Sequence, residues 1–282
     1  MTMDQKWDRL RELLLQMQCA VIAYSGGVDS SLLLKAAADV LGPNIVAVTA
    51  DSETYPPAEL DEAQQFARSL GVRHRILQTA ELSSEDFAAN SPERCYFCKK
   101  ELYGKLKQIA DSEGFPFILD GSNLDDLKDY RPGNRAAGEF GVRSPLREAG
   151  FTKDDVRSCA RMLNLPVWDK PSLACLSSRI PYGTRITPEL LRTIQAAEDH
   201  LRVLGLRQVR VRHHGDTARI EIEQDDFKQL LAEDRHRKVV AGLKTLGYVY
   251  VCLDLEGYRT GSMNEGMKRV RSAECGVRSE KE

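Results

Sequence analysis

Residues 20–41 read AVIAYSGGVDSSLLLKAAADVL, and this stretch decides the fold. The apolar run from Ala20 to Tyr24 is typical of a buried strand, and the residues from Ser31 to Leu41 have the periodicity of a helix. Between them, Ser25 to Ser30 are predicted to form a tight turn around two glycines. A strand, a turn and a helix in this order predict one unit of an α/β protein.

The turn at 25–30 has the properties of an anion-binding site. The first N–H groups of a helix lack intrahelical partners, and the helix dipole adds partial positive charge at that end. Gly26 and Gly27 allow the backbone to approach a phosphate closely, and Ser25 and Ser30 offer hydroxyl groups. The carboxylate of Asp29 would repel a phosphate unless a cation lies between them, so we expect Mg²⁺ beside Asp29.

The same turn resembles a known nucleotide-binding motif. It is not a Walker A loop, because no Gly-Lys-Ser/Thr follows. Ser25-Gly-Gly-Val-Asp-Ser30 is similar to the PP-loop of the ATP pyrophosphatase superfamily. That resemblance implies an enzyme that splits ATP between the α and β phosphates and adenylates a substrate. From the residues alone, a capped helix after a glycine turn is the alternative.

Strands and helices alternate along the first part of the chain. Apolar runs predict strands at 45–50, 74–77 and 117–120, and periodic runs predict helices at 58–70 and 152–163. Residues 91–110 are predicted to be a loop that passes into a helix. This alternation favours an α/β fold, a doubly wound parallel sheet with helices on both faces. Ligands bind such sheets at the carboxyl ends of the strands. We therefore expect Ala50 and Gly121 to line a nucleotide cleft together with the PP-loop.

The sequence changes in character after Thr187. The order helix, strand, strand, helix, strand predicts a smaller C-terminal α+β domain with its own antiparallel sheet. We expect a PP-loop domain at 1–185 and a domain for substrate binding or oligomerisation at 186–270. Residues 271–282 are charged and poor in apolar side chains, so this tail is predicted to be disordered.

Composition limits the class of protein. The formal net charge of −2 gives no overall basic field, which argues against a protein that binds nucleic acid. No apolar run approaches the length of a membrane span and no hydrophobic signal segment is present, so we expect a cytoplasmic protein without a membrane partner. In that reducing compartment the seven cysteines favour metal binding or catalysis over disulfides.

Three cysteines are candidates for chemistry. Cys95 and Cys98 have the Cys-x-x-Cys spacing that places two thiolates on one metal, and Cys175 is the best third ligand. Three cysteines leave one iron of a [4Fe–4S] cluster open for a ligand such as sulfide. The alternatives for the first two are a redox pair or two cysteines buried on a helix face. Cys175 also lies between Lys170 and Arg179, whose charges favour a thiolate that can attack an adenylated carboxylate.

Charged residues elsewhere suggest further ligand sites. Arg210 and Arg212 alternate on one predicted strand, so both point to the same face and can clamp a phosphate, or lie on a solvated face. Glu221 on the next strand and Glu198 can bind a divalent cation or pair with these arginines. After the fourth strand, Asp125 can help hold Mg²⁺ and Arg131 can contact phosphate, unless this loop is only solvated.

Together these motifs resemble the LarE family. They are SGGVDS at 25–30, RCYFCK at 94–99, GSN at 121–123, DYRPG at 129–133, PSLACLSSRIPYG at 171–183 and GYRTGSMN at 257–264. The resemblance implies an ATP-dependent sulfur transferase of nickel-pincer nucleotide biosynthesis, which adenylates a carboxylate of pyridinium-3,5-biscarboxylic acid mononucleotide and inserts sulfur.

In one branch of that family the cysteine matching Cys175 is sacrificed, and in another three cysteines hold a [4Fe–4S] cluster that carries an extra sulfide. Because all three cysteines are present, we favour the cluster branch. The resemblance further implies a homo-oligomer in which Arg210 and Arg212 hold the substrate phosphate. Free sulfide or a cysteine desulfurase would be the sulfur source.

Other classes remain open at the level of sequence. PP-loop enzymes with three cluster cysteines also thiolate tRNA, although the net charge of −2 and the lack of a basic extension argue against that activity. A non-catalytic nucleotide-binding module would bind ATP without releasing pyrophosphate. An amidating PP-loop synthetase would leave the three cysteines without a role.

Overall fold

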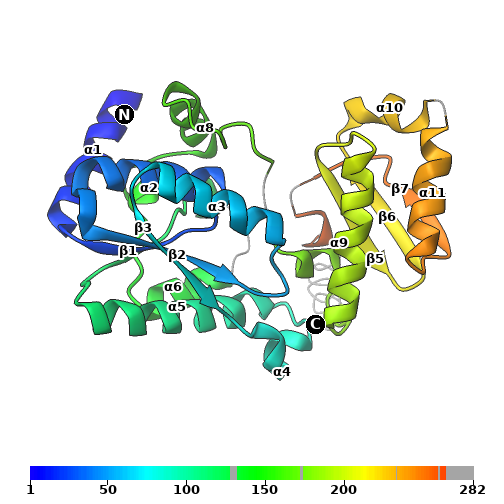
Figure 1. The fold of residues 1–282 in the computed structure, drawn as a ribbon, viewed down its shortest axis with the longest axis horizontal. Coiled ribbons are helices and arrows are strands. Elements are labelled where there is room, and N and C mark those ends of the chain that lie inside the picture. The colour runs from blue at the N-terminus through cyan, green and yellow to red at the C-terminus, as the bar shows by residue number, and fades with distance from the viewer. Residues whose placement is uncertain (128–131, 172–173, 233, 260, 265–282) are drawn as a thin grey trace, which may run out of the picture. The chain divides into compact units, whose positions relative to one another are not determined.

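The structure, a computed structural model, describes residues 1–127, 132–171, 174–232, 234–259 and 261–264 (Figure 1). The chain divides into two compact units, residues 1–173 and 174–282. The loop that contains Cys175 therefore belongs to the second unit. The domain boundary expected after residue 185 stays a prediction, and the tail at 271–282 lies outside the described residues.

The first unit is built on a parallel sheet of four strands. They are β1 (Ala20–Ala23), β2 (Ile45–Asp51), β3 (Arg73–Gln78) and β4 (Ile118–Leu119), in the spatial order β3-β2-β1-β4. In register, Ile22 of β1 lies beside Ala47 of β2 and Leu119 of β4. Strands β1 and β2 are buried almost throughout, as expected for a parallel sheet covered on both faces.

Helices cover both faces of this sheet. One core contains Ile22 and Ala47 with residues of α1 (Met3–Met17), α2 (Val28–Leu41), α3 (Pro57–Ser69) and α8 (Lys153–Met162). The other contains Val21 and Val46 with residues of α5 (Arg94–Glu113) and α6 (Gly133–Glu139). Neighbouring strand residues point to opposite faces, so β1, β2 and β4 each contribute residues to both cores. The doubly wound α/β fold is confirmed (Figure 1).

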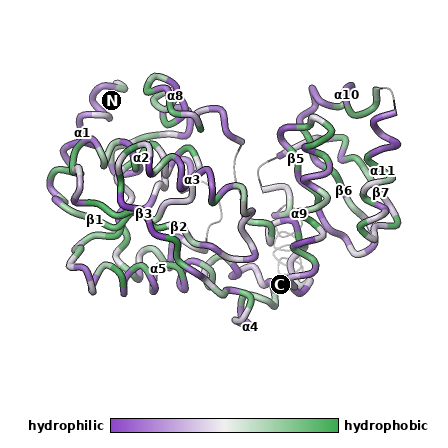
Figure 2. Tube along the Cα trace, viewed as in Figure 1, coloured by the Kyte–Doolittle hydropathy of each residue, from purple (hydrophilic) through white to green (hydrophobic). Residues whose placement is uncertain are grey.

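Hydropathy follows this layering. In Figure 2 the strands β1 and β2 are largely hydrophobic, whereas the outer side of α5 carries hydrophilic residues. None of the helices in the described part of the chain is long and apolar enough to cross a membrane.

Several local predictions need correction. Helix α2 begins at Val28 with Gly27 as its N-cap, three residues earlier than Ser31, so Asp29 and Ser30 lie in its first turn. Residues 121–150, for which no helix was predicted, contain α6 and the short α7 (Pro145–Glu148). Helix α7 has Pro145 at its first position, which suits a helix start. A four-residue helix, α4 (Glu85–Ala88), precedes α5.

The second unit has a three-stranded sheet packed against helices. Its elements are α9 (Pro188–Val203), β5 (Val209–His214), β6 (Thr217–Ile222), α10 (Phe227–Leu231), α11 (Arg235–Thr245) and β7 (Tyr250–Leu253). Strands β5 and β6 are antiparallel, but β6 and β7 are parallel, so the expectation of a purely antiparallel sheet was wrong. The two helices between β6 and β7 supply the crossover that a parallel pair requires.

Three histidines predict that the protein loses stability in mild acid. Burial lowers the pKa of His74, His213 and His214. The charge of Arg68 lowers the pKa of His74 further, and the charge of Arg219 does the same for His214. The unfolded chain therefore takes up protons near pH 6.5 that the folded chain resists, so the free energy of unfolding should fall as pH drops below about 6.5. Urea midpoints measured at pH 7.5, 6.5 and 5.5 would check this.

The matched controls for this experiment are single substitutions. His74→Gln should flatten the pH dependence, whereas His236→Gln, at an exposed position of α11, should leave it unchanged. A urea midpoint that stays constant from pH 7.5 to 5.5 would contradict the prediction.

Candidate active site

The PP-loop joins β1 to the N-terminus of α2. Gly26 has a positive φ of 69°, a conformation that favours glycine. The first intrahelical bond runs from Ser31 N to Gly27 O at 2.9 Å, so the N–H groups of residues 28–30 precede it. These N–H groups and the helix dipole make this end of α2 suited to an anion such as a polyphosphate.

The two loop serines lie together. Ser30 Oγ accepts from Ser25 N at 3.3 Å, lies 3.1 Å from Ser25 Oγ, and donates to Gly27 O at 3.1 Å. The hydroxyls of residues 25 and 30 thus flank the turn from both ends, as the motif predicts.

Two tyrosines that sequence reasoning missed support the loop. Tyr55 OH donates to the carbonyl oxygen of Ser25, and burial, followed by the charge of Glu59, raises the pKa of Tyr55, which keeps the phenol protonated. Tyr24 OH lies 3.4 Å from Ser31 Oγ. In the sequence, only the position of Tyr55 in the polar loop after β2 indicated that it lies near the predicted cleft.

Gly121 contacts the PP-loop directly. A Cβ atom at this position would lie 2.7 Å from Ser30 N and 2.9 Å from Ser30 Cα, both backbone atoms. The chain after β4 therefore passes against the first turn of α2, which only glycine allows without displacement. Ala50, the other residue expected at the cleft, lies in β2 beside Leu77 of β3.

Asp29 is held by two side chains from the segment after β4. Asn123 Nδ2 donates to Asp29 Oδ1 at 2.9 Å, and the ammonium of Lys153 pairs with Asp29 Oδ2. Asp125 Oδ2 accepts from the backbone N–H of Lys153 at 2.8 Å. The role of Asp29 and Asp125 as Mg²⁺ ligands stays a prediction, and Arg131 lies outside the described residues.

Cys95 and Cys98 lie in the first turns of α5. They are three residues apart and therefore share one face of the helix, and both are half-buried. Cys98 Sγ donates to Glu81 Oε1 at 3.7 Å. The pKa of Lys99 is raised by Tyr103 first, against the effect of burial, and also by Cys98, Asp120 and Cys95, so Lys99 is a cation beside this face of the helix.

Cys175 lies at the start of a short 3₁₀ turn in the second unit and is half-buried. Arg179 Nη1 donates to the carbonyl oxygens of Ala174 at 2.6 Å and Cys175 at 3.0 Å, so Arg179 fixes the backbone of this loop. Lys170, expected to flank the thiol, pairs with Glu59 and Glu62 of α3. Within the described residues, no group of three or more His, Cys, Asp or Glu side chains is arranged to hold a metal ion.

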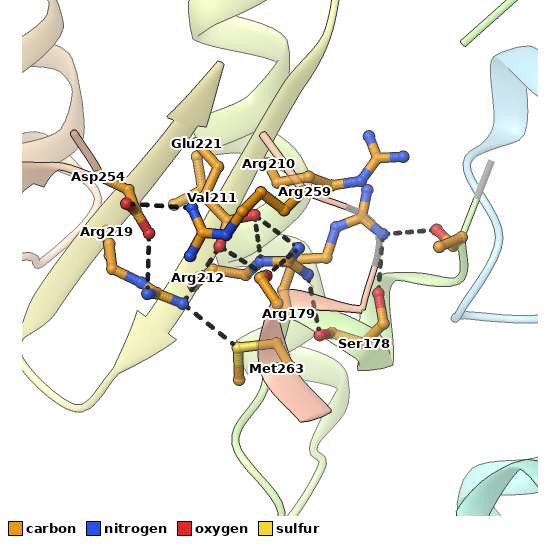
Figure 3. Close-up of polar contacts among 12 residues, drawn as sticks. Ser178, Arg179, Arg210, Val211, Arg212, Arg219, Glu221, Asp254, Arg259 and Met263 are labelled. Atoms are coloured by element: carbon orange, nitrogen blue, oxygen red, sulfur yellow. Dashed lines mark hydrogen bonds and ion pairs between the residues drawn. The ribbon is translucent and has the colours of Figure 1, made fainter. Parts of the chain in front are cut away.

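The second unit contains a buried network of arginines and carboxylates (Figure 3). Arg212 donates twice to Glu221 Oε2, at 3.0 and 2.7 Å, and Arg179 donates to the two carboxylate oxygens of Glu198 at 2.8 and 3.0 Å. Glu198 also accepts from Arg202 Nη2 at 2.8 Å. The structure thus brings Glu198 and Glu221 to arginines, and their role as ligands of a divalent cation stays a prediction.

Positive charge exceeds negative charge in this network. Around the carboxylates of Glu198, Glu221 and Asp254 lie six arginines: Arg179, Arg202, Arg210, Arg212, Arg219 and Arg259. Two of these arginines have a further acidic partner, Asp199 for Arg202 and Glu256 for Arg259. Burial would raise the pKa of Glu198, but the arginines outweigh it and lower that pKa. Burial and the charge of Arg179 lower the pKa of Arg210 to about 10. An anion would relieve this repulsion.

The chain is similar to two curated proteins over nearly its whole length and to others over part of it. Residues 20–110 match the asparagine synthase family. The chain is 42% identical over 276 residues to the pyridinium-3,5-bisthiocarboxylic acid mononucleotide synthase of Lactiplantibacillus plantarum, covering 96% of this chain and 98% of the relative. An uncharacterised Synechocystis protein is 46% identical over 93% of this chain and 98% of its own length. The tRNA-specific 2-thiouridylase of Desulforamulus reducens is 27% identical over 54% of this chain and 52% of its own.

Proposed function

Because the chain belongs to the LarE family, the pyridinium-3,5-bisthiocarboxylic acid mononucleotide synthases, we propose that it converts a carboxylate of pyridinium-3,5-biscarboxylic acid mononucleotide into a thiocarboxylic acid. The chain is an ATP-using, adenylating sulfur transferase with a PP-loop. The observation that carries the proposal is the PP-loop itself, in which two serines and two glycines surround the N-terminus of α2.

Adenylation would take place at the PP-loop. The N–H groups of residues 28–30 and the hydroxyls of Ser25 and Ser30 would bind the phosphates of ATP, while Gly26, Gly27, Ala50 and Gly121 line the nucleotide. A carboxylate oxygen of the substrate attacks the α-phosphorus, and the bond to the bridging oxygen breaks with its electrons on pyrophosphate. Mg²⁺ would lie between the phosphates and the carboxylates of Asp29 and Asp125.

The substrate's own phosphate would bind in the second unit, at Arg210 and Arg212. The excess of arginine over carboxylate there supports this proposal, since buried guanidinium groups favour a bidentate anion. Arg212 also donates hydrogen bonds to Ser178 O and to Ser262 Oγ, each at 3.1 Å. These bonds hold its guanidinium group in one orientation before a ligand binds.

Sulfur transfer would depend on Cys95, Cys98 and Cys175. The first two share a helix face beside the Lys99 ammonium, which fits soft thiolate ligation. These three thiolates would hold a [4Fe–4S] cluster, which would supply an open iron for an extra sulfide, and AMP would leave when sulfide replaces it on the activated carboxylate. In the alternative route the Cys175 thiolate would attack the acyl adenylate and expel AMP, which leaves a thioester. Loss of the Cα proton of Cys175 would then break its Cβ–Sγ bond, so that dehydroalanine remains in the chain and the sulfur departs as the thiocarboxylate.

Iron binding gives a direct test of the cluster route. Protein purified without oxygen should show a broad brown absorption that Cys95→Ala or Cys98→Ala removes. Cys252→Ala is the matched control, because Cys252 is exposed on β7, and it should keep the colour. A colourless protein without iron after reconstitution would rule out the cluster route and leave the sacrificial one.

Three further features are proposed from the family alone. We propose a homo-oligomer, a location in the cytoplasm, and free sulfide or a cysteine desulfurase as the source of sulfur. Two observations support a small-molecule substrate over tRNA: the net charge of −2, and a 2-thiouridylase similarity that covers only 54% of the chain.

A further inference from the structure

Lys153 is the cation that faces the PP-loop carboxylate. Its ammonium pairs with Asp29 Oδ2, while Asn123 holds Asp29 Oδ1 at 2.9 Å. The side chains of Lys153 and Asp29 are both partly exposed, at 30% and 24%. The pair is therefore open to solvent and to a ligand of the PP-loop.

The backbone around Lys153 is fixed by contacts on three sides. Thr152 caps α8 through a capping box with Asp155, and the N–H of Lys153 donates to Asp125 Oδ2 at 2.8 Å. Leu124 N donates to Phe151 O at 2.8 Å, which ties this helix start to the turn after β4. Lys153 thus reaches Asp29 from a rigid helix start, and only its flexible side chain is free to move.

A permanent ion pair is a weak explanation for this arrangement. The pair is partly exposed, so solvent screens it and weakens its contribution to stability. Asp29 lies in the first turn of α2, where the helix N-terminus attracts phosphates and a bare carboxylate would repel them. An ammonium in this position can neutralise the carboxylate in the free enzyme and turn to a phosphate oxygen when ATP is bound.

We propose that Lys153 is a catalytic residue of adenylation, whose ammonium leaves Asp29 and contacts the pyrophosphate part of ATP. When the carboxylate oxygen attacks the α-phosphorus, the bond to the bridging oxygen breaks and its electron pair remains on pyrophosphate. Lys153 stabilises that charge without transferring a proton. This role rests on the adenylation step of the proposed function.

The test compares ATP with AMP, because only ATP carries the group that Lys153 contacts. With Mg²⁺ in a calorimeter, Lys153→Gln should weaken ATP binding about tenfold and leave AMP binding unchanged within about twofold. In the full reaction, the same variant should release pyrophosphate about 10²-fold more slowly. Lys153→Arg keeps the charge and should restore part of both losses.

Lys6→Gln is the matched control. Lys6 pairs with Asp155 of the same helix at similar exposure, 15% and 20% of the side chain, but does not contact the PP-loop. This variant should keep wild-type ATP binding and pyrophosphate release. Equal losses of ATP and AMP binding in Lys153→Gln, or wild-type values for both ATP binding and pyrophosphate release, would overturn the role of Lys153. If the wild type binds ATP but releases no pyrophosphate with the carboxylate substrate, the proposed function fails, and the calorimetry still decides the phosphate contact.

Discussion

Replacing Cys175 with serine should abolish formation of the thiocarboxylic acid while ATP-dependent release of pyrophosphate continues. The PP-loop belongs to the first compact unit and Cys175 to the second, so removing the thiol leaves the adenylation residues intact. Arg179 holds the carbonyl oxygens of Ala174 and Cys175 and not the thiol, so the loop should keep its shape. We expect product to fall by at least about 10³-fold, as when a nucleophile is removed.

Two measurements would separate the outcomes for Cys175. Mass spectrometry of the product and a pyrophosphate assay should be run on Cys175→Ser and on Cys252→Ser, which removes an exposed thiol of β7 and should behave as wild type. Normal product from Cys175→Ser would refute a role for this thiol in either route. For the wild-type chain, a mass lower by one hydrogen sulfide after turnover identifies sacrifice, and an unchanged mass identifies the cluster route.

Gly121→Ala should have the largest effect on adenylation among substitutions that remove no functional group. The added methyl would meet the backbone of Ser30 at 2.7 and 2.9 Å, and backbone cannot yield as a flexible side chain does. The first turn of α2 would have to shift, and a displacement of about 1 Å at a reacting site can cost about 10²-fold in rate. Overpacking should also destabilise the fold by about 1–3 kcal/mol.

Gly138→Ala provides the control for Gly121→Ala. Position 138 lies in α6 with no atom within 4 Å of an added Cβ, so alanine should be neutral or slightly stabilising there. Thermal unfolding, ATP affinity and pyrophosphate release should be compared for both variants. If Gly121→Ala matched Gly138→Ala in thermal unfolding, ATP affinity and pyrophosphate release, the close approach of Gly121 to the PP-loop would have no bearing on catalysis.

Local patterns in the sequence were sufficient for the fold of the first unit. Strand β1, the glycine turn and α2 are neighbours in sequence, and their apolar periods are unambiguous, so only the helix start was misplaced, from Val28 to Ser31. The helix predicted from residue 152 was likewise readable, and it starts with a capping box between Thr152 and Asp155 that spans only four residues. The parallel pairing of β6 with β7 could not be predicted from the sequence, because the pairing of distant strands leaves no local signal.

The candidate site shows the same limit. Serines 25 and 30 could be placed together because a turn joins them. The partners of Asp29 lie 94 and 124 residues further along the chain, at Asn123 and Lys153, and Tyr55 reaches Ser25 from 30 residues away. Such contacts depend on how the strand ends converge in space. A polar residue directly after a strand can be placed at the carboxyl edge of the sheet, but the sequence does not say which residue it contacts there.

The arginine network of the second unit also sets how the protein responds to ionic strength. Guanidinium groups stay charged at neutral pH, so the attraction of Arg210, Arg212 and their neighbours for an anion changes little between pH 6 and 8. Dissolved salt is different, because the screening length shrinks from about 8 Å at 0.15 M to about 3 Å at 1 M. At 1 M salt the association rate of an anionic nucleotide would therefore fall, while the buried ion pairs of Glu198 and Glu221 would persist.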